Sequence, residues 1–248
     1  MSISQPPKRF LLLSLCMLAV FSQATLAQTR ATQDTLWAKA VALAEANQNW
    51  MPTLWHEAET IFDKKGKVEE TTERQLLLGV MPDGNLDVQV TRATKNGKDD
   101  LETARRELEA SKEAYARDNP EDNLFDPSIQ HTVTATRSSD VKRINGRAYV
   151  GFTYVQTTQE GDWAGTAWLD AETGMPAQVE STPQGLPMKE DGVEVRALTS
   201  ITHFNVSAPD AWYPVKVQID VEFKAKYAVF SFKGTSKTTI TLSGYERF

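Results

Sequence analysis

The chain has 248 residues, with 27 basic and 33 acidic side chains and a formal net charge of −6. A chain of this length can bury roughly 70% of its unfolded surface, so its core needs no disulfide or structural metal. The acidic balance argues against a nucleic-acid partner, because neutralising phosphates requires clustered Lys and Arg. The composition also excludes a disordered tail, a disulfide-rich miniprotein and a protein embedded in the membrane.

The N-terminus has the three regions of a secretory signal peptide. Basic residues Lys8 and Arg9 precede an apolar run over residues 10–21, and small residues follow up to Ala27. The apolar run is shorter than the about 20 residues that a transmembrane helix requires. We therefore expect residues 1–27 to be a cleaved signal peptide and residues 28–248 to form a single β-rich domain. Export predicts a periplasmic protein, with secretion as the alternative.

Cleavage would also change the charge and the cysteine content. Removal of Lys8 and Arg9 leaves 25 basic against 33 acidic residues, a net charge of −8. Cys16 lies in the apolar run and is the only cysteine. The mature chain therefore has no thiol, which excludes cysteine nucleophiles, disulfides and thiolate metal sites.

The mature chain begins with a predicted amphipathic helix over residues 32–46, because apolar side chains recur there at spacings of three and four. Pro52 prevents its continuation. Predicted strands at residues 53–63 and 68–80 flank a turn that contains Gly66. A second predicted turn at residues 82–85 leads into a strand that alternates from Leu86.

A second helix is predicted at residues 99–117. Its narrow apolar stripe includes Leu101 and Leu108, and oppositely charged side chains four residues apart can pair along its outer face. We expect this helix to lie on a sheet. The segment that follows, residues 118–127, is acidic and contains proline, so we expect a solvated loop that is too polar for the core.

The rest of the chain is predicted to be almost entirely β. Residues 215–224 alternate strictly between apolar and polar side chains, which is typical of a strand with one buried face. A turn is expected at Lys233-Gly234. The predicted strands are residues 129–137, 148–158, 163–170, 177–182, 193–205, 213–224, 227–233 and 237–245.

About eleven strands in mostly hairpin order predict a large antiparallel sheet, which must curl or close. The expected fold class is α+β, mostly β. We expect a half-barrel with the N-terminal helix and the inserted helix on or in its concave face.

Motifs for catalysis and metal binding are incomplete in this sequence. His56-Glu57 resembles the start of a zinc-protease motif, but Thr60 replaces the second histidine. His131 and His203 are isolated in predicted strands. Ser139 to Lys142 has the serine-x-x-lysine spacing of penicillin-recognising enzymes, but it lies in a predicted turn and the companion motifs are missing.

One pair of carboxylates has suitable spacing for acid–base chemistry. Glu57 and Glu59 are two residues apart, so they share one face of a predicted strand. We expect them to be exposed glutamates at a sheet edge. We therefore predict no catalytic residue, no metal site and no cofactor.

The aromatic residues indicate an apolar interior. Trp163 and Trp168 are five residues apart on one predicted strand and so point to opposite faces, and residues 227–232 are apolar on both sides. A curled sheet with aromatic side chains inside can bind an acyl chain or another apolar ligand. The candidate ligand-lining residues are Trp55, Trp163, Trp168, Phe230, Phe232, Leu101 and Leu108.

The charge is distributed unevenly along the chain. Residues 211–248 carry six basic and three acidic side chains. These lysines can protect an edge strand from unwanted pairing or approach an anionic membrane surface. We expect at most peripheral contact with a membrane.

The organisation of the chain resembles the LolA-like superfamily of periplasmic proteins, which includes outer-membrane lipoprotein carriers and lipoprotein-sorting homologues. The resemblance covers the whole mature chain. It depends on the signal peptide, the N-terminal helix, the antiparallel strand series and the run GTAWLDAETGMP at residues 165–176, with its aspartate-led turn and proline. The resemblance implies a half-barrel fold and a lipid or lipoprotein as partner, but no individual functional residue.

Three functions remain open from the sequence. The first is a non-enzymatic periplasmic protein that shelters a lipid or a lipoprotein acyl chain in the concavity of the half-barrel. The second is an interaction module or scaffold that binds another envelope protein and no small molecule. The third is an envelope hydrolase that uses Glu57 or His131.

Overall fold

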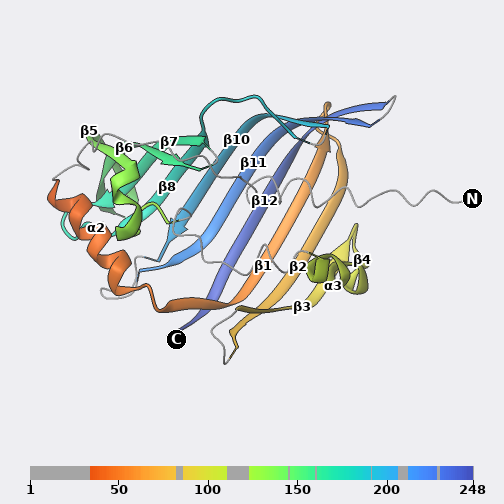
Figure 1. Ribbon diagram of the computed structural model, residues 1–248, viewed down its shortest axis with the longest axis horizontal. Helices are drawn as coiled ribbons and strands as arrows, with labels where there is room; N and C mark the ends of the chain where they lie inside the picture. Colours follow the sequence, from red (N-terminus) through yellow and green to blue (C-terminus); the bar gives the residue numbers. More distant parts are fainter. Residues whose placement is uncertain are drawn as a thin grey trace, which may run out of the picture.

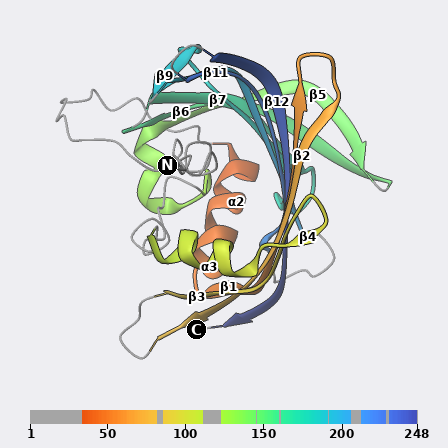
Figure 2. The ribbon, with the colours of Figure 1, turned by 90° about the vertical axis from the view of Figure 1, so that its right-hand side faces the viewer.

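The computed structural model describes residues 34–81, 86–110, 123–144, 146–159, 161–190, 192–205, 212–227 and 230–247. In this part of the chain, twelve strands form one antiparallel sheet. The sheet is curled and unclosed, and helices lie on its concave side (Figure 1, Figure 2). The expected fold class is confirmed. The predicted signal peptide lies outside the described residues.

The helices are α2 (Thr35–Ala46), α3 (Leu101–Ala110) and the short 3₁₀ helix η2 (Pro127–Thr132). The strands are β1 (Trp50–Asp63), β2 (Val68–Val80), β3 (Leu86–Lys95), β4 (Lys98–Asp99), β5 (Val133–Ile144), β6 (Arg147–Thr158), β7 (Gly161–Asp170), β8 (Pro176–Pro183), β9 (Met188–Glu190), β10 (Val193–Phe204), β11 (Pro214–Tyr227) and β12 (Phe230–Arg247).

The strand order is β4-β3-β2-β1-β12-β11-β10-β8-β7-β6-β5, and β9 pairs with β10 outside this series. Most neighbours in the sheet are also neighbours in the sequence. The exceptions are the pairing of β8 with β10, which passes over the short β9, and the pairing of β1 with β12, which joins the first strand to the last. This seam places the two halves of the chain side by side near the middle of the sheet (Figure 1).

The cross-strand register identifies the side chains on the concave face. Phe152, Ala167 and Val179 are paired across β6, β7 and β8 and pack in the same cluster as the buried residues of α2. Residues that are directly paired across neighbouring strands point to the same face of a sheet. The residues in register with these three therefore also point inward. This inward row continues across the sheet through Thr202, Val217, Ile240, Glu57 and Arg74.

Helix α2 covers one end of the concave face. Its first turn is capped by Asp34, whose side chain accepts a hydrogen bond from the backbone N–H of Leu36 at 2.8 Å. Trp37 is 2% exposed, and its ring centroid lies 5.0 Å from that of Phe125 and 5.6 Å from that of Phe152. These contacts attach the helix to β6 and to the segment before η2, and confirm the predicted N-terminal helix.

Helix α3 covers the opposite end of the concave face (Figure 1). Ala104 is 1% exposed and packs against β2 and β3 in a separate apolar cluster, which Leu101 and Leu108 extend. The predicted apolar stripe is therefore the face that contacts the sheet. The described part of this helix ends at Ala110, so the predicted residues 111–117 lie outside the described residues.

The expectation that residues 118–127 are too polar for the core is wrong for the described end of that segment. Leu124 is 6% and Phe125 0% exposed, and both belong to the cluster around α2. The prediction rested on the acidic composition of the whole segment and overlooked two adjacent apolar residues, which are buried in the core. Residues 118–122 lie outside the described residues.

The strand predicted at residues 129–137 begins later and continues further. Residues 127–132 form η2, because Asp126 caps them by accepting from the N–H of Ser128 at 2.8 Å and Pro127 suits the first turn. β5 then runs to Ile144, through the Ser139 to Lys142 segment that was expected to be a turn. A register irregularity between Arg137 and Val141 bends the strand without ending it.

The turn predicted at Lys233-Gly234 is also wrong. Tyr227 pairs with Phe230, so the chain reverses there, and β12 is continuous from Phe230 to Arg247. Gly234 lies inside this strand, where a Cβ atom would overlap the backbone oxygen of Phe62 on β1. The glycine permits close approach of two strands and does not form a turn.

The first hairpin turn is confirmed. Gly66 has a φ of 78°, and the carboxylate of Asp63 accepts hydrogen bonds from the N–H groups of Lys65 and Lys67 at 2.7 and 2.9 Å. The bond from Lys67 is the main reason that the pKa of Asp63 is lowered. The second predicted turn, at residues 82–85, lies outside the described residues.

Candidate functional site

The middle of the concave face lies between the two helix-covered ends. Helix α2 packs chiefly against β7 and η2, and α3 packs chiefly against β3. Between them, some inward side chains of β10, β11 and β12 are only half-buried although these strands are at the centre of the sheet, whereas Leu198, Val221 and Ile240 on the same face are buried. We call this surface the central floor. Its residues are Ser200, Thr202, Val217, Ile219 and Thr238.

One border of the central floor is apolar. Val221 and Phe223, the next inward residues of β11, are buried with residues of β10. Phe232 and Trp163 are partly buried against this cluster, and the ring centroids of Phe223 and Phe232 are 5.8 Å apart. The aliphatic surface of the floor therefore continues into an apolar wall.

A second border carries charge. Arg74 of β2 forms an ion pair with Glu107 of α3, and their side chains are 15% and 9% exposed. Glu57 of β1 is directly opposite Arg74 in the register and is 6% exposed. Glu59 accepts a hydrogen bond from the hydroxyl of Ser236 at 2.7 Å.

The expectation that Glu57 and Glu59 are exposed at a sheet edge is wrong, although their common face is confirmed. β1 lies between β2 and β12, so it is an interior strand, and both glutamates point into the concavity. The polar alternation of this strand gave no sign that its partner would be the last strand of the chain.

A mostly polar row of side chains crosses the floor from β2 to β8. In the register, Thr72, Glu59, Thr238, Ile219, Ser200 and Ser181 follow one another from β2 to β8. At its far end the hydroxyl of Ser181 lies 2.6 Å from that of Tyr154. Burial raises the pKa of Tyr154 to about 12, so this phenol is neutral at physiological pH.

The structure brings the sequence-predicted ligand-lining residues into two separate groups. Trp55 lies with Leu101 and Leu108 in the cluster beneath α3. Trp163 lies with Phe232 in the apolar wall beside the central floor.

The remaining two candidates are not in these groups. Trp168 is next to the inward residues Ala167 and Leu169, so it points to the convex face. There its indole N–H donates to Glu180 at 3.3 Å, and the Lys142 ammonium is 5.3 Å from its ring centroid. Trp163 and Trp168 thus point to opposite faces, as predicted. The side chain of Phe230 lies outside the described residues.

Sequence reasoning missed the polar members of the central floor. The alternation of residues 215–224 did identify Val217 and Ile219 as inward-facing. Ser200, Thr202 and Thr238 had no comparable signal, because small hydroxyl residues are common on both faces of strands. Only the register with β11 assigns them to the floor.

The three histidines are dispersed in the structure. His131 lies in η2, where its Nδ1 is 2.9 Å from the backbone oxygen of Ser128, and His203 lies on β10 with its Nε2 3.1 Å from the Gln218 side chain. Among the described residues, no group of three or more His, Cys, Asp or Glu side chains could hold a metal ion. None of the described helices is long and apolar enough to cross a membrane.

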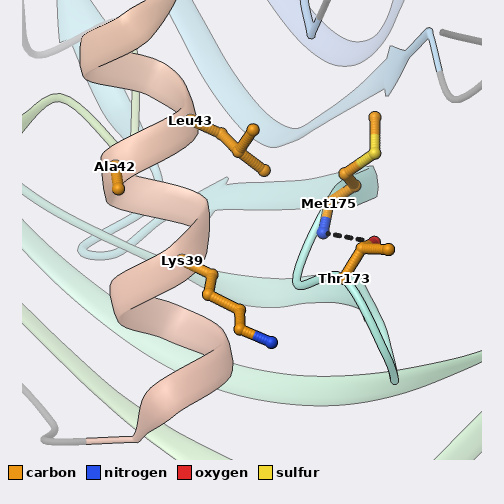
Figure 3. A pocket seen from close by; sticks show the side chains of 5 residues that line it. All are labelled: Lys39, Ala42, Leu43, Thr173 and Met175. Carbon is orange, nitrogen blue, oxygen red and sulfur yellow. Dashed lines mark hydrogen bonds between the residues drawn. The ribbon is translucent and has the colours of Figure 1, made fainter. Parts of the chain in front are cut away.

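A pocket of about 310 Å³ lies outside the concave floor, between α2 and the β7–β8 turn (Figure 3). Lys39 reaches across to this turn and donates to the backbone oxygen of Glu172 at 3.0 Å. The turn itself is organised by Asp170, which accepts from the N–H groups of Glu172 and Thr173 at 3.0 and 2.9 Å. Burial opposes ionisation of Asp170, but these donors outweigh it, so its pKa is lowered. The Lys39 hydrogen bond joins α2 to this turn, and the turn has the aspartate-led form expected from the sequence.

Comparison with known proteins found no matching family model and no matching curated protein. A domain described as outer-membrane lipoprotein-sorting, from Vibrio parahaemolyticus, is similar in structure with a TM-score of 0.33 and 9% identity, over 85% of this chain and 93% of that one. A DUF1329 family protein from Desulfovibrio piger is similar with a TM-score of 0.37 and 8% identity, over 88% of this chain and 94% of that one. Both similarities are remote.

Proposed function

We propose that this protein is an exported, non-enzymatic binding protein of the bacterial periplasm. It shelters an apolar ligand, such as a lipid or the acyl chain of a lipoprotein, on the concave face of its sheet. The observation that carries this proposal is the central floor, where Val217 and Ile219 are half-buried at the middle of the sheet. Each methylene that a ligand buries there contributes about 0.8 kcal/mol.

The surroundings of the floor support the same function. Trp163 and Phe232 extend the aliphatic surface at one border, so an alkyl chain on Ile219 would continue onto aromatic side chains. The two helices stand at either end of the curled sheet and leave the middle strands between them. An elongated apolar ligand fits such a surface better than a compact polar one.

Uptake of the neutral fluorescent probe N-phenyl-1-naphthylamine tests the proposal. We expect saturable binding to the wild-type protein, with increased probe emission. Ile219→Asn should weaken binding about tenfold, because it places an amide in the apolar path. Val155→Asn is the matched control, because Val155 is 42% exposed and points to the convex face. Absence of saturable uptake by the wild-type protein would refute the proposal.

The alternative of an interaction module is favoured by one observation on the convex face. Leu54 and Leu77 are directly paired across β1 and β2 and are 49% and 42% exposed. Crosslinking in intact cells distinguishes this alternative. A partner that is captured by the wild-type protein and lost from a Leu54→Ser, Leu77→Ser variant, together with no probe uptake, would select it.

A further inference from the structure

The central floor contains hydroxyl groups that form no side-chain hydrogen bonds with the described residues. Within the described residues, the side chains of Ser200, Thr202 and Thr238 have no hydrogen-bond partner, although all three are half-buried beside Val217 and Ile219. A half-buried hydroxyl group in apolar surroundings can still donate one hydrogen bond and accept others. The floor is therefore apolar surface with polar groups at fixed places.

Glu59 is the charged member of the same row. Glu59 is half-buried and lies directly opposite Thr238. Its carboxylate accepts a hydrogen bond from the hydroxyl of Ser236 at 2.7 Å. Within the described part of the chain Glu59 forms no ion pair. A carboxylate that is partly removed from water gains from a nearby positive charge.

Among the described residues, two basic side chains on this part of the concave face have acidic partners. Arg74 is paired with Glu107, and Lys95 is paired with Glu70 at 2.8 Å between Nζ and Oε2. Glu59 therefore adds uncompensated negative charge beside the apolar floor. An anionic head group placed there would be repelled, and a cationic one attracted.

We propose that the floor selects amphiphiles with a cationic ammonium head group over anionic ones. The ammonium pairs with Glu59 and donates a second hydrogen bond to the hydroxyl of Thr238, while the alkyl chain lies along Val217 and Ile219. This inference rests on the proposed function and defines the chemistry of its ligand.

Competition between two amphiphiles of equal chain length tests the inference. Dodecylamine, which is protonated at pH 7, and dodecanoate displace bound N-phenyl-1-naphthylamine from the intact mature protein at concentrations below micelle formation. We expect dodecylamine to displace the probe at about tenfold lower concentration, as for a partly desolvated ion pair. Glu59→Gln should reduce this preference to about twofold or less, when each displacement is corrected for the affinity of the variant for the neutral probe.

The controls separate this inference from the proposed function. Glu73→Gln removes the same charge from an exposed position on the convex face of β2 and should keep the full preference. Thr238→Val preserves the shape of the side chain and should weaken the binding of dodecylamine more than that of dodecanoate. This variant serves as the test if Glu59→Gln does not fold. Equal displacement by both amphiphiles, or a preference that persists in Glu59→Gln, would overturn the inference. Failure of the wild-type protein to bind the neutral probe would instead overturn the proposed function.

Discussion

Arg74 of β2 and Glu107 of α3 form an ion pair on the concave side of the sheet, and this pair joins the inserted helix to the strands beneath it. The contact is nearly buried, and Glu57 lies opposite Arg74 on the neighbouring strand. Helix α3 is thus attached by charge as well as by its apolar stripe.

Replacing Glu107 should destabilise the protein. Glu107→Gln leaves a mostly buried guanidinium with fewer acceptors, and we expect a loss of about 1–3 kcal/mol in the free energy of unfolding. Urea denaturation followed by circular dichroism measures this loss. Glu102→Gln on the same helix is the control, because the Glu102 side chain is 84% exposed and its loss should cost less than about 0.5 kcal/mol. Equal effects of the two substitutions would show that the Arg74 pair does not hold the helix.

The glycine inside β12 should be intolerant of a side chain. Gly234→Ala would place a Cβ against the backbone oxygen of Phe62 and against the Phe232 ring, so we expect a loss of about 2–3 kcal/mol. Gly79→Ala on β2 is the control, because its nearest neighbour would be the Cβ of Asp87 at 3.9 Å. Thermal unfolding of the two variants should show a large decrease in melting temperature for Gly234→Ala alone. A tolerated alanine at position 234 would argue against the close approach of β1 and β12.

The raised pKa of Tyr154 predicts a loss of stability at alkaline pH. Its pKa is about 12 in the folded protein because burial disfavours the phenolate, against 10.0 for an exposed tyrosine. The stabilisation is complete below pH 10 and is lost as the pH rises from 10 to 12, since the unfolded chain releases this proton first. The Tyr154 contribution to this loss approaches roughly 2 kcal/mol.

Tyr154→Phe isolates that contribution. At pH 8 the variant should be less stable than the wild type by about 1 kcal/mol, because it lacks the hydrogen bond between Tyr154 and Ser181. Above pH 10 the difference should shrink and then reverse, because phenylalanine has no proton to release. Urea titrations at pH 8, 10 and 11.5 measure both effects, and a constant difference across this range would contradict the assignment.

The fold class follows from patterns that are local in the sequence. The period of α2, the alternation of residues 215–224 and the glycine turn after Asp63 each depend on neighbours within a few residues. Gly234 and Phe125 were misassigned because their roles depend on partners far away in the chain: the backbone of Phe62 for the glycine, and Trp37 for the phenylalanine.

The candidate site was only partly predictable for the same reason. Trp163 and Phe232 were identified by their apolar character, and they border the floor. Glu59 was recognised as sharing a face with Glu57, but its position in the interior depends on the pairing of β1 with β12. Pairing between two strands at opposite ends of the chain produces no periodic pattern in the sequence of either strand.

The seam between β1 and β12 determines when the concavity can exist during synthesis. Residues such as Trp55 and Leu242, which are paired across it, are separated by most of the chain. A nascent chain that lacks its last strand leaves one edge of β1 and one edge of β11 unpaired, although β2 and β10 can already pair with their other edges. Pairings between such distant segments form slowly. The two halves of the sheet can therefore join only after residues 230–247 have been synthesised, and Glu59 and the central floor come together only at that stage.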